Sequence, residues 1–195
     1  MTYSIIGSGK VGSALARQFA RSGIPVGVAN TRGSQSLTAL VNDLGELITA
    51  QSLAEALGAD IVILAIPFNA HREIGQKLSD WDNRIVIDAM NTYGVSPEEL
   101  GDQASTDVVA RAFVAAKVVK TFNQLPAALL AKDPAQEGGR RVMFVWGRDQ
   151  DANTRVTKLV DQLGFAPLSL GTIEEGGKLL GLGGALILQN IIKYQ

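Results

Sequence analysis

The amino-acid sequence predicts a single α/β domain built on a doubly wound parallel sheet, with a short C-terminal α/β extension. Short apolar runs that favour strands alternate along the chain with amphipathic segments that favour helices, which is the pattern of such a sheet. The run from Ile61 to Ile66 is apolar throughout and stops at Pro67, as expected for a central strand buried on both faces. The 195 residues, with 46% hydrophobic content, provide one well-packed core and leave little for a second.

The other elements are expected at regular intervals. Strands are expected at residues 3–6, 24–29, 47–48, 61–66, 85–87, 117–120 and 142–145, with an edge strand at 166–168. A helix is expected to begin at Pro97, and an amphipathic helix to cover 151–163. The apolar stretch 179–192 is shorter than the roughly 20 residues that span a bilayer, and we expect a buried terminal helix there. Residues 1–125 form the expected ligand-binding core, and residues 126–195 complete the same domain.

The first expected strand leads into a glycine-rich turn that opens a helix. In such a turn the first glycine permits a tight bend, the second lets the main chain approach a pyrophosphate, and the third lets the helix pack on the strand. The helix N-terminus adds free N–H groups and the positive end of a dipole. We therefore expect the turn to bind a dinucleotide; an unrelated strand-to-helix turn is the alternative. The residues concerned are Gly7, Ser8, Gly9, Lys10, Val11 and Gly12.

The end of the second expected strand bears on which dinucleotide is bound. An NAD-selective protein normally places Asp or Glu about 20 residues past the glycines, where the carboxylate accepts hydrogen bonds from the ribose 2′-OH. This chain has Asn30, Thr31, Arg32 and Ser34 there and no carboxylate. Hydroxyls and a guanidinium can bind a 2′-phosphate, which a carboxylate would repel. The sequence predicts NADP(H), with an ordinary polar loop as the alternative.

Composition excludes several classes of function. The net charge of −1 gives no electrostatic footprint for nucleic acid or an acidic membrane surface. The chain has no cysteine, which excludes disulfides, cysteine-ligated metals and thiol catalysis. A functional strand at the N-terminus leaves no room for a signal peptide, so we expect a cytoplasmic protein. The glycine-rich apolar tail leads us to expect a homodimer.

Three segments follow expected strands at the edge of the sheet where ligands bind: Ala65-Ile66-Pro67-Phe68, Met90-Asn91 and Phe122-Asn123. They supply aromatic rings and neutral amides, but no Ser-His-Asp constellation, metal cluster or Lys-Tyr pair. We therefore expect no catalytic acid or base and no metal. The single histidine, His71, is expected at the surface, with contact to the cofactor as the alternative. Met90 either packs against the cofactor or belongs to the core.

The chain resembles the NADP-dependent oxidoreductases of coenzyme F420, a deazaflavin, whose nucleotide fold also occurs in the cytoplasmic domain of the STEAP metalloreductases. The resemblance covers nearly the whole chain. It rests on the glycine turn, Asn30-Thr31-Arg32, Ala65-Ile66-Pro67-Phe68, Asp88-Ala89-Met90-Asn91, Lys117-Val118-Val119-Lys120-Thr121-Phe122-Asn123, Phe144-Val145-Trp146-Gly147 and Leu163-Gly164-Phe165. One departure is Phe68, where many relatives have Trp after the proline.

The resemblance implies a Rossmann-type fold and a set of site residues. It implies that the turn holds the pyrophosphate and that Thr31 and Arg32 hold the 2′-phosphate. It implies that Ile66, Pro67, Asn91 and Phe122 flank the nicotinamide against the acceptor. We further expect Ala65 and Met90 to contact the cofactor, and Phe68, Phe122 and Asn123 to contact the acceptor.

These observations predict an NADP(H)-dependent oxidoreductase that passes hydride between NADPH and a flat small-molecule acceptor such as coenzyme F420 or a flavin. Hydride transfer between two flat rings needs stacking and exclusion of water, and the proton can come from solvent. Two alternatives stay open. One is an NADPH-binding redox sensor without turnover, and the other is a small imine or carbonyl reductase, which would need a proton donor.

Overall fold

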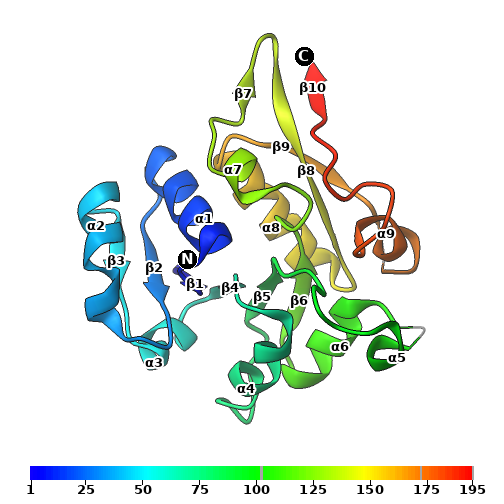
Figure 1. Ribbon diagram of the computed structural model, residues 1–195, viewed down its shortest axis with the longest axis horizontal. Coiled ribbons are helices and arrows are strands. Elements are labelled where there is room, and N and C mark those ends of the chain that lie inside the picture. The colour runs from blue at the N-terminus through cyan, green and yellow to red at the C-terminus, as the bar shows by residue number, and fades with distance from the viewer. Residues whose placement is uncertain (102, 172, 195) are drawn as a thin grey trace.

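The computed structural model describes residues 1–101, 103–171 and 173–194 and shows a layered α/β protein (Figure 1). The strands are β1 Tyr3–Ile6, β2 Val26–Ala29, β3 Ile48–Ala50, β4 Ile61–Leu64, β5 Ile85–Asp88, β6 Lys117–Lys120, β7 Ala135–Gln136, β8 Gly139–Gly147, β9 Ala166–Ser169 and β10 Ile192–Tyr194. The helices are α1 Lys10–Arg21, α2 Thr38–Leu44, α3 Leu53–Leu57, α4 His71–Gly75, α5 Pro97–Leu100, α6 Ser105–Ala112, α7 Ala127–Leu130, α8 Gln150–Gln162 and α9 Ile173–Leu180, with 3₁₀ turns at Ser34–Leu37 and Phe68–Ala70.

The central sheet is parallel from β3 to β6 and has the strand order of a doubly wound fold. Its order is β10-β8-β6-β5-β4-β1-β2-β3. The pairings β1–β2, β2–β3, β1–β4, β4–β5 and β5–β6 are all parallel. The chain reverses direction across the sheet between β1 and β4, which creates a crevice at the carboxyl ends of the strands where ligands bind in such folds. The predicted Rossmann-type architecture is confirmed.

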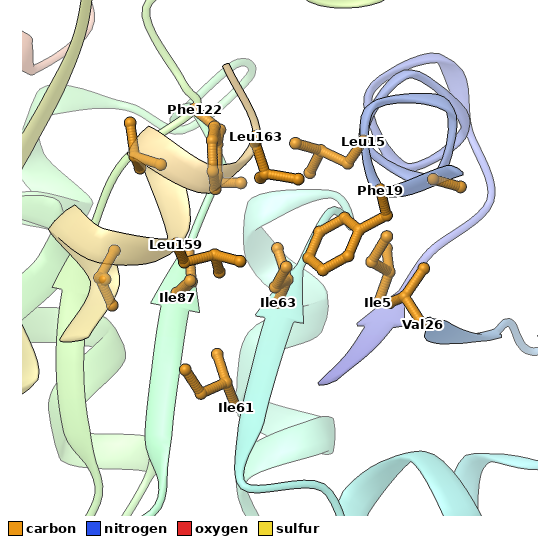
Figure 2. Close-up of a cluster of buried hydrophobic side chains, with 14 of the residues drawn as sticks. Ile5, Leu15, Phe19, Val26, Ile61, Ile63, Ile87, Phe122, Leu159 and Leu163 are labelled. Atoms are coloured by element: carbon orange, nitrogen blue, oxygen red, sulfur yellow. The ribbon is translucent and has the colours of Figure 1, made fainter. Parts of the chain in front are cut away.

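Two apolar clusters cover the two faces of this sheet, because successive side chains of a strand point to opposite sides. On β4, Ile61 and Ile63 face one cluster, whereas Val62 and Leu64 face the other. Figure 2 shows part of the first cluster, where Leu15 and Phe19 of α1 and Leu159 of α8 meet the strand side chains. The second cluster packs α3, α4 and α6 on the opposite face. The four β4 side chains have no exposed surface, which explains their uninterrupted apolar run.

The C-terminal extension departs from the parallel pattern. Strand β8 is nine residues long, pairs antiparallel with β6 at one end, and projects beyond the parallel part of the sheet, where β7 and β10 flank it (Figure 1). Strand β9 joins β8 in parallel, with Val142 opposite Ala166. The sequence indicated neither β7 nor β10, and the expected strand at 142–145 is the middle of the longer β8.

The stretch 179–192 is not the buried terminal helix that we expected. Helix α9 ends at Leu180, an irregular segment follows, and Ile192 begins the short strand β10. Leu188 is 58% exposed and Leu182 45%, whereas Ile187 is buried with Leu180 in the cluster against β8, and the half-buried Leu186 packs on that cluster. Gly181, Gly183 and Gly184 lower the helix propensity of this stretch, and Gly183 has φ +84°, which is outside the helical range. The homodimer inferred from this tail stays a prediction.

Side-chain hydrogen bonds of Gln124 connect the irregular segment to β8. Its amide oxygen accepts a hydrogen bond from Phe144 N at 2.9 Å, and its amide nitrogen donates to Val142 O at 3.2 Å. The main-chain oxygen of Gln124 accepts from Leu188 N at 2.7 Å. The side chain of Gln124 therefore makes the hydrogen bonds to the main chain of β8 that a neighbouring strand would make, in the part of β8 between its pairings with β6 and β10. The main chain of Gln124 holds the tail in place.

Candidate functional site: a dinucleotide crevice

Close contacts at the end of β1 explain two of the three motif glycines. Gly7 has φ +111°, a conformation that L side chains rarely adopt, and a Cβ added there would lie 2.2 Å from Ala65 O. A Cβ added to Gly12 would lie 1.9 Å from Gly7 O. Gly7 N donates to Ala29 O at 2.8 Å, which ties the turn to the end of β2. These glycines permit α1, β1 and β4 to approach each other.

Gly9 is different, because a Cβ added there would meet nothing within 4 Å. Packing of the protein against itself does not require a glycine at this position. Gly9 is the N-cap of α1, no side chain caps the helix, and the first helical bond runs from Ser13 N to Gly9 O at 2.9 Å. The N–H groups of the first turn are therefore available to an external acceptor. Open space beside uncapped N–H groups fits a pyrophosphate.

The loop after β2 carries a polar network that reaches the glycine turn. Asn30 Nδ2 donates to Ser8 Oγ at 2.7 Å and to Ser36 Oγ at 2.9 Å. Asn30 Oδ1 accepts from Arg32 N at 2.9 Å, and Arg32 Nη2 donates to Ser8 Oγ at 3.3 Å. The guanidinium therefore lies beside the turn, on the side where the ribose of a bound nucleotide would lie. Thr31 is exposed in the same loop.

Ser36 is a member of this network that the sequence did not indicate. Its hydroxyl donates to Gly33 O at 2.7 Å and also bonds to Asn30. Ser34, which we expected to contact the 2′-phosphate, is exposed at the start of the same 3₁₀ turn. A glycine with φ +86° at position 33 reverses the chain and brings position 36 back to Asn30. The Gly33-Ser34-Gln35-Ser36 sequence was the available signal, since glycine followed by serines favours such a turn.

The segment after β4 lines the crevice opposite the glycine turn. Ala65 N donates to Ile6 O at 2.9 Å, Ala65 and Ile66 are half-buried, and Pro67 is exposed. Phe68 is buried against His71, with ring centroids 4.8 Å apart. A hollow of about 170 Å³ next to it is lined by Phe68, Asn69, Arg72, Val95, Leu100 and Val108.

Two asparagines join the ends of β5 and β6. Asn91 Nδ2 donates to Asn123 O at 2.9 Å, and Asn123 Nδ2 donates to Asn91 Oδ1 at 3.0 Å and to Leu180 O at 2.9 Å. Asn123 Oδ1 is buried without a hydrogen-bond partner, as is the neighbouring hydroxyl of Thr121. Met90 is buried in the cluster that contains α4 and α6. Unpaired buried acceptors at a ligand crevice fit an amide donor from a bound molecule.

The structure corrects the role expected for Phe122. Its ring is 1% exposed and packs in the core, 6.4 Å from the ring of Phe165 and beside Leu163 (Figure 2). A ring in this position stabilises the protein and presents no face to an acceptor. The main chain of Phe122 has φ +65°, which is rare for an aromatic residue. This bend directs the ring into the core and lets Asn123 follow at the crevice.

The structure also corrects the expected surface position of His71. The imidazole is 1% exposed, at the start of α4. Its Nδ1 lies 2.5 Å from Phe68 O, so Nδ1 carries the proton, and Nε2 is buried without a partner. Burial lowers the pKa of His71, an effect opposed by the Phe68 hydrogen bond, so the ring is neutral at neutral pH.

The described residues offer little else for proton or metal chemistry. No group of three His, Asp or Glu in the ranges that the structure describes could hold a metal ion. Asp88 and Lys120, at the ends of β5 and β6, are buried and paired with each other at 3.0 Å. The crevice therefore combines anion-binding main chain, the guanidinium of Arg32 and neutral amides.

Comparisons with known proteins agree with this geometry. A family model described as "NADP oxidoreductase coenzyme F420-dependent" matches residues 2–92. Metalloreductase STEAP3 of Rattus norvegicus is 30% identical over 171 residues, which is 87% of this chain and 33% of that protein. The chain thus spans about a third of the length of this curated relative.

Two solved structures extend the likeness to the whole chain. The hypothetical protein SMa0349 from Sinorhizobium meliloti is 43% identical, with a TM-score of 0.94 over 99% of this chain and 96% of that one. A protein from Arthrobacter sp. FB24, described as an F420-dependent NADP reductase, is 23% identical, with a TM-score of 0.75 over 99% of this chain and 100% of that one. The second likeness shows the fold.

No helix in the described ranges is long and apolar enough to cross a membrane. The glycine turn and the loop after β2 both lie within the part of the chain that the family model matches. Residues 2–92 thus match the family of coenzyme F420-dependent NADP oxidoreductases, and 171 residues of the chain are similar to a STEAP metalloreductase.

Proposed function

We propose that this protein transfers hydride between NADPH and a flat heteroaromatic acceptor such as coenzyme F420 or a flavin. One observation carries the proposal. The crevice has the polar groups needed to hold NADP(H), whereas Asp88 and Lys120, at the ends of β5 and β6, are buried and paired with each other, and His71, after β4, is only 1% exposed. Transfer between two rings needs no protein proton donor, whereas reduction of an imine or carbonyl does.

The chain's own residues would bind the phosphates of the cofactor. The open space at Gly9 and the N–H groups of the first turn of α1 suit the pyrophosphate. Arg32 and the hydroxyls of Ser8 and Ser36 suit the 2′-phosphate, because charge-assisted hydrogen bonds from a guanidinium are strong. We include Thr31 and Ser34 in this subsite because both are exposed on the same loop.

Other residues would orient the nicotinamide and the acceptor. NADPH supplies the hydride when bound. The half-buried Ala65 and Ile66 provide an apolar surface, and Asn91 and Asn123 are held rigid by their mutual hydrogen bonds. Asn123 Oδ1 can accept a hydrogen bond from a carboxamide without losing any present partner. Phe68 and the hollow beside it are proposed to contact the acceptor. Holding two rings in contact is the main contribution that these residues make to the rate.

A turnover assay tests the proposal. The purified protein is given NADPH with a deazaflavin, a flavin or a cyclic imine, and the loss of NADPH absorbance is followed, with NADH as the matched control donor. We expect turnover with the deazaflavin or the flavin and a strong preference for NADPH. Turnover with the imine alone would contradict the proposal and indicate a proton donor. NADPH binding without turnover on any acceptor would favour a redox sensor.

A further inference from the structure

The ends of β5 and β6 hold an ion pair that the dinucleotide subsites do not use. Asp88 is the last residue of β5 and Lys120 the last of β6, and the two are opposite each other in the sheet. Lys120 Nζ lies 3.0 Å from Asp88 Oδ2, and the side chains are 2% and 0% exposed. Thr106 of α6 donates to the same carboxylate oxygen at 3.1 Å.

This pair holds both main-chain polar atoms of Met90. Lys120 Nζ donates to Met90 O at 2.6 Å, and Met90 N donates to Asp88 Oδ1 at 3.0 Å. Strand pairing with β4 and β6 ends at Asp88, so these side chains replace the sheet hydrogen bonds that Met90 lacks. The next residue is Asn91, whose amide bonds to Asn123. The ion pair therefore determines where the segment after β5 enters the crevice.

Stability alone does not explain a charged pair at this position. Removing two charges from water is costly, and apolar residues of similar volume often stabilise a core as well as a buried ion pair does. Neighbouring positions on these strands, Ile87 and Val119, are apolar and have no exposed surface. The pair fixes one conformation for Met90 and Asn91, because Lys120 binds the main-chain oxygen of Met90 and Asp88 binds its main-chain nitrogen.

We propose that Asp88 and Lys120 are positioning residues that set the Met90–Asn91 segment against the nicotinamide ring. They act through Met90 and do not touch the reacting atoms. The inference rests on the proposed function, since it assigns the nicotinamide to this segment. Loss of the pair should disturb hydride transfer more than cofactor affinity, because other segments bind the phosphates, at the glycine turn after β1 and at Arg32 after β2.

The test compares the wild-type protein with the double variant Asp88→Asn/Lys120→Met. The asparagine keeps an acceptor for Met90 N, the methionine removes the donor to Met90 O, and the pair of substitutions leaves no lone buried charge. We expect NADP⁺ affinity, measured by calorimetry, to stay within about threefold. We expect kcat to fall at least tenfold while KM for NADPH changes little, and the fluorescence of bound NADPH to change because its ring is held differently.

Gln18→Met is the matched control. Gln18 is a fully buried polar residue on α1 whose amide donates to Leu130 O and Lys132 O, away from the strand ends. The Gln18→Met substitution should lower the melting temperature but leave kcat and the fluorescence of bound NADPH at their wild-type values. A folded double variant with wild-type kcat and emission would overturn the inference. So would equal losses in affinity and kcat.

Two further measurements separate this inference from the proposed function. If the wild-type protein turns over no acceptor, the proposed function fails, but the emission of bound NADPH still shows whether the ion pair positions the ring. If the double variant does not fold, a crystal structure of the wild-type protein with NADP⁺ decides. A nicotinamide ring in contact with Met90 or Asn91 supports the inference, and a ring elsewhere overturns it.

Discussion

The two ends of the crevice are built in different ways. At the phosphate end, the glycine turn and the loop after β2 present exposed main chain, hydroxyls and a guanidinium within one short stretch of sequence. At the other end, Met90, Phe122 and Asn123 are buried and held by contacts with residues far away in the chain. In the proposed mode of binding, recognition of the phosphates would depend on local geometry, whereas the ring-binding end would depend on the tertiary structure around it.

This difference predicts opposite consequences for substitutions at two glycines of the same turn. Gly9→Val should abolish binding of NADPH and NADH, at least a hundredfold by calorimetry, because the side chain would fill the space for the pyrophosphate. The fold should survive, since an added Cβ meets nothing within 4 Å. Gly12→Ala is the matched comparison, and it should lower stability because its Cβ would lie 1.9 Å from Gly7 O. A folded Gly9→Val protein that still binds nucleotide would refute the phosphate assignment.

At the other end of the crevice, Phe122→Ala should act mainly on stability. Deleting a buried aromatic ring typically costs about 3–5 kcal/mol in the free energy of unfolding. Denaturant unfolding measures this, with Val114→Ala as a control at a position that is 57% exposed. The folded Phe122→Ala protein should retain its affinity for NADPH. A loss of turnover without a loss of stability would restore the acceptor role that the sequence suggested.

These two regions also differ in how far the sequence could predict them. The parallel strands and the glycine turn were predictable, because apolar runs and glycines act through neighbouring residues. The inward direction of Phe122 was not, because it depends on a main-chain φ of +65° that no local pattern signals for phenylalanine. Nor was β10, since its neighbouring segment is held by the buried side chain of Gln124. The ends of elements and the positions of buried polar residues require the tertiary structure.

Cofactor choice provides a sharper test within the phosphate end. Arg32→Ala removes the charge-assisted bonds that we assign to the 2′-phosphate, which are worth about 1.5–3 kcal/mol, or roughly 10- to 150-fold in NADPH affinity. NADH affinity should change little, because NADH has no 2′-phosphate. Arg17→Ala is the control, since that arginine is engaged with Asp43 at 2.6 Å. Equal weakening of NADPH and NADH by Arg32→Ala would show that the arginine does not select the cofactor.

The smallest effect is expected at His71, which belongs to the buried end of the crevice. Burial lowers its pKa in the folded protein, so the unfolded chain binds a proton more tightly. Folding stability should therefore decrease as the pH falls through the unfolded pKa of about 6.5. His71→Gln should flatten this dependence in denaturant unfolding at a series of pH values.

Turnover by the His71→Gln protein should stay within a few-fold of the wild-type value, because loss of a general acid would cost about a hundredfold or more. A hundredfold loss in a folded His71→Gln protein would instead place proton transfer at this end and favour a reductase that protonates its substrate.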